Sequence, residues 1–223
     1  MKNKEISISR ESEEYLEAIY RLEEKTGFAK TMELARQLKV APGSVTNTVE
    51  SLERRGLVIH KPYKGVKLTR EGRKLALEVL RRHRLAERLL MDFLRLDWSQ
   101  VHDAACKLEH AIGKDIVKPL EEALSHPRIC PHGNPIPTAR GGVIEERSEP
   151  LLDLNPKETA IIVKITKEDP ATLQHLARLG LVLGASVEVE HKIPFGGPIT
   201  IKVGDVTHTI EENFASVINV RRR

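Results

Sequence analysis

The chain has 223 residues, of which 40% are hydrophobic and 30% charged, a balance typical of a globular protein with a core and an ionised surface. No apolar run is long enough for a signal peptide or a membrane span, and two cysteines do not make a disulfide framework. We therefore expect a cytoplasmic protein without membrane contact.

The positive charge of the chain is concentrated in its first third. The net charge is only +4, yet residues 30–74 contain 11 Lys and Arg against 4 Glu and no Asp, a balance of +7. A surface that binds a polyanion needs such a basic segment. A solvated basic face with no partner is the alternative explanation.

The same segment has the element order of a winged helix-turn-helix. Apolar residues at helical spacing predict helices over 13–26, 31–40 and 41–56, the last starting at a Pro-Gly pair. Residues 57–69 alternate and turn at 63–65, which predicts a β-hairpin. Two short helices followed by a basic hairpin indicate this DNA-binding fold.

In that fold the N-terminal residues of the second helix lie against base edges in the major groove. These are small, mostly uncharged residues: Pro42, Gly43, Ser44, Thr46 and Asn47. Four cations behind them are expected to contact phosphates: Arg54, Arg55, Lys61 and Lys64. Small polar residues also cap ordinary helices, so capping alone is the alternative explanation.

The remainder of the chain divides into a helical and a strand-rich part. Residues 69–124 are helical and leucine-rich, and they carry more apolar side chain than a short helix pair can hide, which predicts a homodimer. Prolines and glycines make 125–150 a linker. Strand-like runs follow at 158–169, 185–192, 198–205 and 206–212, with one short helix, and predict a small β-barrel.

Metal-binding side chains are concentrated on the two longest predicted helices of the middle part. One helical face about 100° wide collects four of them: His102, Cys106, Glu109 and His110. Upstream, His83 and Glu87 form an i,i+4 pair. Separately, these patterns also fit a buried cysteine beside surface residues and a surface ion pair. Together, on adjacent helices, they predict a metal site.

A second possible ligand trio lies in the linker, at His126, Cys130 and His132. These residues are embedded in a proline-rich loop, so a structural role for that loop is the alternative.

Three motifs lie behind the winged helix and ahead of the β-domain, in the order "HRLAERLL", "VHDAACKLEH" and "HGNPIP". In this order they resemble the diphtheria-toxin-repressor family of metal-dependent transcriptional regulators. The C-terminal "LARLGLVLGASVEV" and "PFGGPITIKV" resemble the SH3-like domain of that family, which also occurs in ferrous-iron transport proteins. The resemblance implies an α+β chain with a winged helix-turn-helix (1–74), a helical dimerisation and metal-binding domain with its linker (75–147) and an SH3-like domain (148–223).

The resemblance also implies two metal sites. One would use His83, Glu87 and His102, with a carboxylate from the SH3-like domain, for which Asp169 lies nearest and Glu168 next. The other would use Cys106, Glu109 and His110, completed from the N-terminal helix by Glu14 or Glu17. Iron-sensing members have Met at position 14, whereas manganese-sensing members have carboxylates at 14, 17 and 106.

The donor set indicates which metal the chain would take. A thiolate favours softer or borderline ions, whereas carboxylates suit Mn(II). One sulfur, one nitrogen and several oxygens fit Fe(II) best, with Mn(II) as the alternative, and we expect Zn(II), Co(II) or Ni(II) to bind in vitro.

The resulting prediction is a metal-activated repressor that binds double-stranded operator DNA as a homodimer, with no small-molecule substrate and no enzymatic activity. A metal-dependent hydrolase is one alternative, but it would need an open metal position and a nearby base, and no HExxH motif is present. A metal buffer or iron-transport accessory protein is another, which leaves the basic winged helix without a role.

Overall fold

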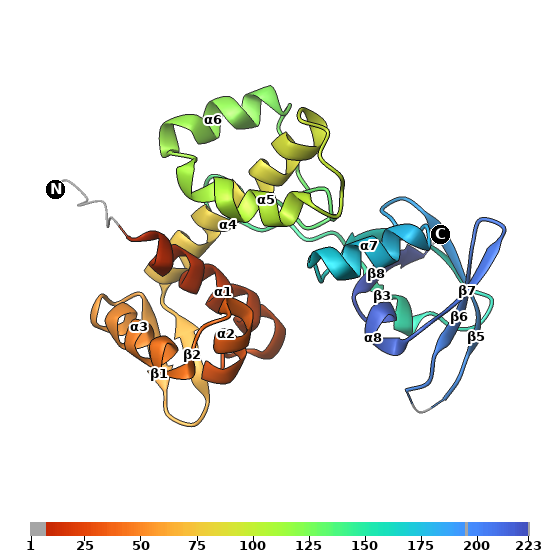
Figure 1. Ribbon diagram of the computed structural model, residues 1–223, viewed down its shortest axis with the longest axis horizontal. Helices are drawn as coiled ribbons and strands as arrows, with labels where there is room; N and C mark the ends of the chain where they lie inside the picture. Colours follow the sequence, from red (N-terminus) through yellow and green to blue (C-terminus); the bar gives the residue numbers. More distant parts are fainter. Residues whose placement is uncertain (1–7, 195, 223) are drawn as a thin grey trace. The chain divides into compact units, whose positions relative to one another are not determined.

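The structure, a computed structural model, describes residues 8–194 and 196–222 (Figure 1). These residues form two compact units. The first consists of the residues up to 82 together with 137–142, and the second of 83–136 together with the residues from 143 onwards. In the described part of the chain, every helix is too short or too polar to cross a membrane.

The first unit is the predicted winged helix-turn-helix. Its three helices are α1 (Arg10–Thr26), α2 (Thr31–Leu38) and α3 (Pro42–Arg54), and its wing is the antiparallel hairpin of β1 (Val58–Lys61) and β2 (Gly65–Leu68). Residues 70–82 of α4 (Arg70–Asp92) complete the unit. The helix-helix-helix-hairpin order can be followed in Figure 1.

Local sequence explains why α3 and the wing form where they do. Pro42 starts α3, where its missing N–H costs nothing, and Val45, Val49 and Leu52 are buried. Glycine is required at position 65, where β2 leaves the turn of the wing, because a Cβ there would lie 2.6 Å from the carbonyl oxygen of Ala29. The wing is thus attached to the loop before α2.

The helical part of the second unit continues α4 from residue 83 and adds α5 (Val101–Leu108), a 3-10 turn (Glu109–Ala111) and α6 (Lys114–Ala123). Its buried apolar side chains are Leu85, Ala86, Leu90, Val101, Ala105, Ile112, Leu120, Leu124 and Ile136. Ile136 belongs to the proline-rich segment, which therefore packs into this core and is not merely a spacer.

The rest of the second unit is a six-stranded antiparallel sheet with short helices. Its strands are β3 (Glu149–Pro150), β4 (Thr159–Ile165), β5 (Ser186–Lys192), β6 (Ile199–Val203), β7 (Val206–Ile210) and β8 (Ile218–Arg222), in the order β3-β8-β4-β5-β6-β7. A 3-10 turn (Leu151–Asp153), α7 (Pro170–Arg178) and α8 (Glu212–Ala215) cover its core. Together the two units give the predicted α+β fold.

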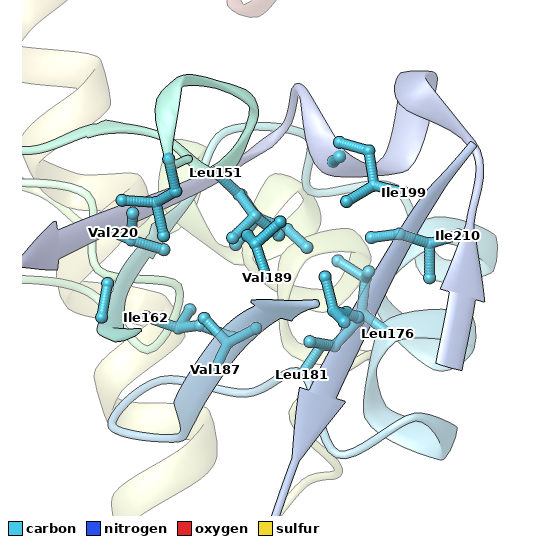
Figure 2. Packing of buried hydrophobic residues seen from close by; sticks show 14 of the residues in the cluster. Leu151, Ile162, Leu176, Leu181, Val187, Val189, Ile199, Ile210 and Val220 are labelled. Carbon is cyan, nitrogen blue, oxygen red and sulfur yellow. The ribbon is translucent and has the colours of Figure 1, made fainter. Parts of the chain in front are cut away.

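The core of this sheet comes from alternate residues of its strands. Val187 and Val189 on β5 point inward with Ile162 on β4 and Val220 on β8, and helix α7 adds Leu176 (Figure 2). Period-2 alternation of apolar residues in the sequence produces this inner face. This packed core supports the loop between β4 and α7, which carries Glu168 and Asp169.

Candidate metal centre and DNA-binding surface

Helices α4 and α5 bring three of the predicted ligands together. His83 and Glu87 are one turn apart on α4, and both are fully buried. The Nε2 atom of His83 lies 3.1 Å from Oε1 of Glu87 and 3.1 Å from Nδ1 of His102 on α5. Buried titratable groups at such distances are typical of a metal or catalytic site.

Of the two carboxylates considered in the SH3-like domain, Glu168 lies beside His102 and Asp169 does not. Oε2 of Glu168 lies 3.5 Å from Nδ1 of His102, and the side chain is buried. Asp169 instead caps α7, where it accepts hydrogen bonds from the backbone N–H and the hydroxyl of Thr172 at 3.0 and 2.7 Å. Aspartate is a preferred helix cap, and capping turns its carboxylate towards the helix. The structure thus places Glu168 in the cluster and Asp169, which was predicted to be the nearer of the two, at the start of α7.

The proline-rich segment adds two more metal-binding side chains to this cluster. Cys130 and His132 are buried, and their ligand atoms lie within 4.8 Å of those of Glu87 and Glu168. His126, the third member of the trio considered from sequence, is exposed and outside this group. The pairing of Cys130 and His132 with Glu87 was not foreseen. The only sequence signal for this pairing was a cysteine and a histidine two residues apart in a proline-rich segment.

Backbone and side-chain contacts fix the proline-rich segment in this place. The amide of Asn134 donates to Oε1 of Glu168 at 2.6 Å and to the carbonyl of Ile165 at 3.0 Å. Gly133 has φ +83°, and a Cβ there would lie 2.1 Å from the carbonyl oxygen of Val163 on β4. Arg84 on α4 donates to the carbonyl of Pro135. Hydrogen bonds to the side chains around a metal site, such as that of Asn134 to Glu168, hold those side chains in the orientation that binding needs.

Two buried polar atoms of the cluster indicate that it requires a cation. Oε2 of Glu87 and Nδ1 of His132 have no hydrogen-bond partner among the described residues. Nε2 of His132 lies 3.1 Å from the carbonyl of Trp98, so it must donate, and Nδ1 faces Oε1 of Glu87 at 3.4 Å. Buried carboxylates are costly unless they are paired with a positive charge. A metal ion, or protons on the neighbouring imidazoles, would supply that charge.

The ionisation of the cluster follows from burial and mutual charge. Burial disfavours the charged form of Glu87, but the charge of His83 and a hydrogen bond from His102 hold its pKa well below the usual value. Burial lowers the pKa of His102, but Cys106 and Glu87 raise it to about 9. Burial raises the pKa of the Cys106 thiol, and hydrogen bonds from His102 and His83 bring it below its usual value. A thiolate is therefore easier to form at Cys106.

The second predicted site is only partly assembled on α5. The helix ends at Leu108, and Glu109 and His110 lie in the following 3-10 turn, so the predicted single helical face is interrupted. Glu109 contacts His110 Nε2 at 3.1 Å through Oε1 and His83 Nδ1 at 2.5 Å through Oε2. Sγ of Cys106 lies 3.8 Å from Nε2 of His102. Glu109 thus joins the predicted second site to His83.

Glu14 and Glu17 lie on α1 in the first unit. Glu14 is partly exposed and contacts Arg10 at 2.9 Å, whereas Glu17 is buried and contacts Arg21 at 2.8 Å. Because Glu14 is the more exposed of the two carboxylates, it is the more accessible as a metal ligand.

The nine residues predicted to bind DNA all belong to the first unit, and each of them is exposed. They are Pro42, Gly43, Ser44, Thr46, Asn47, Arg54, Arg55, Lys61 and Lys64. The hydroxyl of Thr46 donates to the carbonyl of Pro42 at 3.2 Å. Asn47 has no such internal hydrogen bond within the described residues, and its amide is free to pair with a base edge.

The sequence matches three family models in chain order. Residues 7–66 match the iron dependent repressor N-terminal DNA binding domain, 69–138 the iron dependent repressor metal binding and dimerisation domain, and 149–222 the FeoA domain. The diphtheria toxin repressor of Corynebacterium glutamicum is 34% identical over 214 residues, which cover 89% of this chain and 94% of that protein. The chain belongs to the iron-dependent repressor family.

Relatives of this repressor include both iron- and manganese-dependent proteins. The iron-dependent repressor IdeR of Mycobacterium tuberculosis is 33% identical over 95% of this chain and 96% of its own length. A manganese-dependent transcriptional repressor solved in complex with manganese superposes with a TM-score of 0.86 at 30% identity, covering 95% of this chain and all of the other. IdeR of T. acidophilum gives 0.81 at 28%, covering 97% and 99%.

Members of the family are transcriptional repressors, not enzymes, and the repressor described here is metal-dependent like its relatives. Neither the hydrolase nor the metal-buffer alternative finds support among these relatives.

Proposed function

We propose that this repressor takes up Fe(II) or Mn(II) in the cytoplasm and, in that state, binds operator DNA as a homodimer. The observation that supports this most strongly is the buried cluster around Glu87. Within the described residues, Oε2 of Glu87 and Nδ1 of His132 have no hydrogen-bond partner there, and a bound cation would satisfy both. The winged helix-turn-helix with its exposed α3 supplies the DNA-binding part of the proposal.

Two ligand groups are proposed. The first is centred on Glu87 and Glu168, with His83 and His102 from the helices and Cys130 and His132 from the proline-rich segment. The second consists of Cys106, Glu109 and His110, with Glu14 as the ligand from α1 and Glu17 as the other candidate. A divalent ion at either group would supply the positive charge that these carboxylates and thiols need.

The chemistry of the donors favours Fe(II) over Mn(II) by a modest margin. Each group contains a thiol together with imidazoles and carboxylates, and a thiolate prefers a borderline ion to a hard one. Zn(II), Co(II) and Ni(II) also suit such donors, so we expect them to activate the repressor in vitro. Intracellular supply, not affinity alone, would then decide the physiological metal.

The division of the second group between the two units accounts for activation. Glu14 belongs to the first unit, whereas Cys106, Glu109 and His110 belong to the second. When all four share one ligand set, the DNA-binding unit is restricted to fewer orientations, which shifts an existing population of conformers. Only some of these orientations let a dimer contact two half-sites about 34 Å apart. The exposed apolar residues Phe93, Leu94 and Ile116 are candidates for the dimer surface.

The proposal is tested by fluorescence anisotropy on a labelled duplex from the region upstream of the repressor's own gene. Binding should be strong with Fe(II) or Mn(II) and lost with excess chelator, and it should return when metal is restored. A Glu87→Gln variant should need more metal for the same binding. Equal affinity in chelator and in metal would show that metal does not activate the protein.

A further inference from the structure

Helix α3 presents a third residue on the face that carries Gly43 and Asn47. Residues 43, 47 and 50 follow the i, i+4, i+7 spacing that places side chains on one side of a helix. The opposite side is buried through Val45, Val49 and Leu52. Thr48, at the flank, lies 3.1 Å from Glu11 Oε1 on α1 and fixes the rotation of the helix. Glu50 is therefore exposed on the same face as Asn47.

The carboxylate of Glu50 is unused within the repressor. Among the described residues it has no hydrogen bond and no ion pair, although Arg54 stands one turn away at a spacing that commonly gives one. Its neighbour Glu53 behaves differently, since it accepts a hydrogen bond from the backbone N–H of His60 at 2.8 Å and thereby holds the wing. Glu53 has a structural role, whereas Glu50 has none in the described structure.

A negative charge at this place opposes the general attraction of the surface for DNA. Residues 30–74 carry 11 cations and 4 carboxylates, and their balance favours phosphates. Glu50 weakens that attraction in the part of the helix that faces the groove, so it lowers affinity for DNA of any sequence. A compensating contact with one particular base would turn this general cost into selectivity.

We propose that Glu50 is a specificity-determining residue that accepts a hydrogen bond from the N4 amino group of a cytosine in the major groove of the operator. A carboxylate only accepts hydrogen bonds. Cytosine offers only a donor there, whereas guanine offers N7 and O6 and thymine offers O4, all of them acceptors. Adenine offers a donor at N6 but an acceptor at N7 beside it. Glu50 therefore favours cytosine, with adenine second, and repels guanine and thymine at the position that it faces. This inference rests on the proposed operator binding.

The test is selection of binding sites from a randomised duplex library in Mn(II), followed by affinity measurements on the selected site with each base at every position. The wild-type repressor should require cytosine at one position of each half-site, with roughly five- to hundredfold loss for other bases. Glu50→Ala should abolish the preference at that position alone. Glu50→Gln should move it towards adenine, because an amide pairs with N6 and N7 of adenine.

Glu71→Gln is the matched control, because Glu71 is an exposed carboxylate of the same unit outside α3. It removes the same charge and should leave every base preference unchanged. If both Glu50 variants keep the wild-type consensus and merely bind all duplexes more tightly, as the control does, Glu50 acts only through its charge and the inference is wrong. If the wild-type protein selects no sequence in Mn(II), operator binding itself fails and the inference fails with it.

Discussion

Replacing the adjacent carboxylates Glu168 and Asp169 one at a time should separate metal binding from helix capping. Glu168→Gln keeps the shape of the side chain and an oxygen for Asn134, which donates to Glu168 at 2.6 Å, but it removes a charged ligand. Loss of an outer contact to a metal ligand typically costs 10- to 100-fold in affinity, and loss of a charged ligand should cost at least as much. We therefore expect the affinity for Mn(II) to fall at least about tenfold, or ~1.4 kcal/mol.

Asp169→Ala should have the opposite profile. It removes two hydrogen bonds to Thr172 at the start of α7, and loss of such a cap costs about 1 kcal/mol of stability. For a chain of this size the melting temperature should fall by roughly 2–4 °C. The affinity for Mn(II) should stay within about twofold of wild type, because this carboxylate points at the helix and not at the cluster.

Isothermal titration calorimetry with Mn(II) and thermal unfolding in chelator together distinguish the two residues. Glu168→Gln should bind metal weakly and unfold near the wild-type temperature, whereas Asp169→Ala should bind normally and unfold earlier. A weak-binding Asp169→Ala protein beside a normally binding Glu168→Gln protein would refute the assignment of Glu168.

Three further predictions concern the thiol, the wing and pH. Cys106→Ala should abolish activation at low micromolar metal. Cys106→Asp should retain part of the activation and prefer Mn(II), because a carboxylate replaces the softest donor. A Cys106→Ala repressor that responds fully to metal in an anisotropy titration would contradict the role of Cys106 as a ligand. Lys61→Ala should weaken binding to all duplexes alike and lower the slope of log affinity against log salt by about one unit. Asn47→Ala should instead cost about 1–3 kcal/mol of binding free energy at particular base pairs. Equal changes in base preference for the two variants would contradict the contact of the wing with phosphates. The raised pKa of His102, about 9, means that the metal-free fold binds a proton there that the unfolded chain releases near pH 6.5. Its contribution to metal-free stability should be complete below about pH 6.5 and lost as pH rises towards 9, while affinity for Mn(II) rises over the same interval because the metal displaces that proton. Calorimetry and thermal unfolding at pH 6, 7, 8 and 9 would check both trends, and an affinity independent of pH would exclude proton displacement.

The local spacing of residues was sufficient to predict the winged helix-turn-helix and half of the buried cluster of possible metal ligands. The buried face of α3 and the exposure of Asn47 follow from the 3.6-residue period, which relates side chains only a few positions apart. The same period placed His83 beside Glu87, and the resemblance to the family placed His102 opposite them. Each of these inferences needs only the geometry of one helix or of two neighbours.

Only the tertiary structure decided which distant residues complete the cluster. Glu168 and Asp169 are neighbours of the same charge, and they differ because helix capping engages one and leaves the other beside Asn134. Cys130 and His132 reach Glu87 because the proline-rich segment is held against β4, through the close approach at Gly133. Such contacts join residues far apart in the chain through packing and single hydrogen bonds. No periodic pattern records them, so the sequence by itself could name the donor types but not the full set that meets.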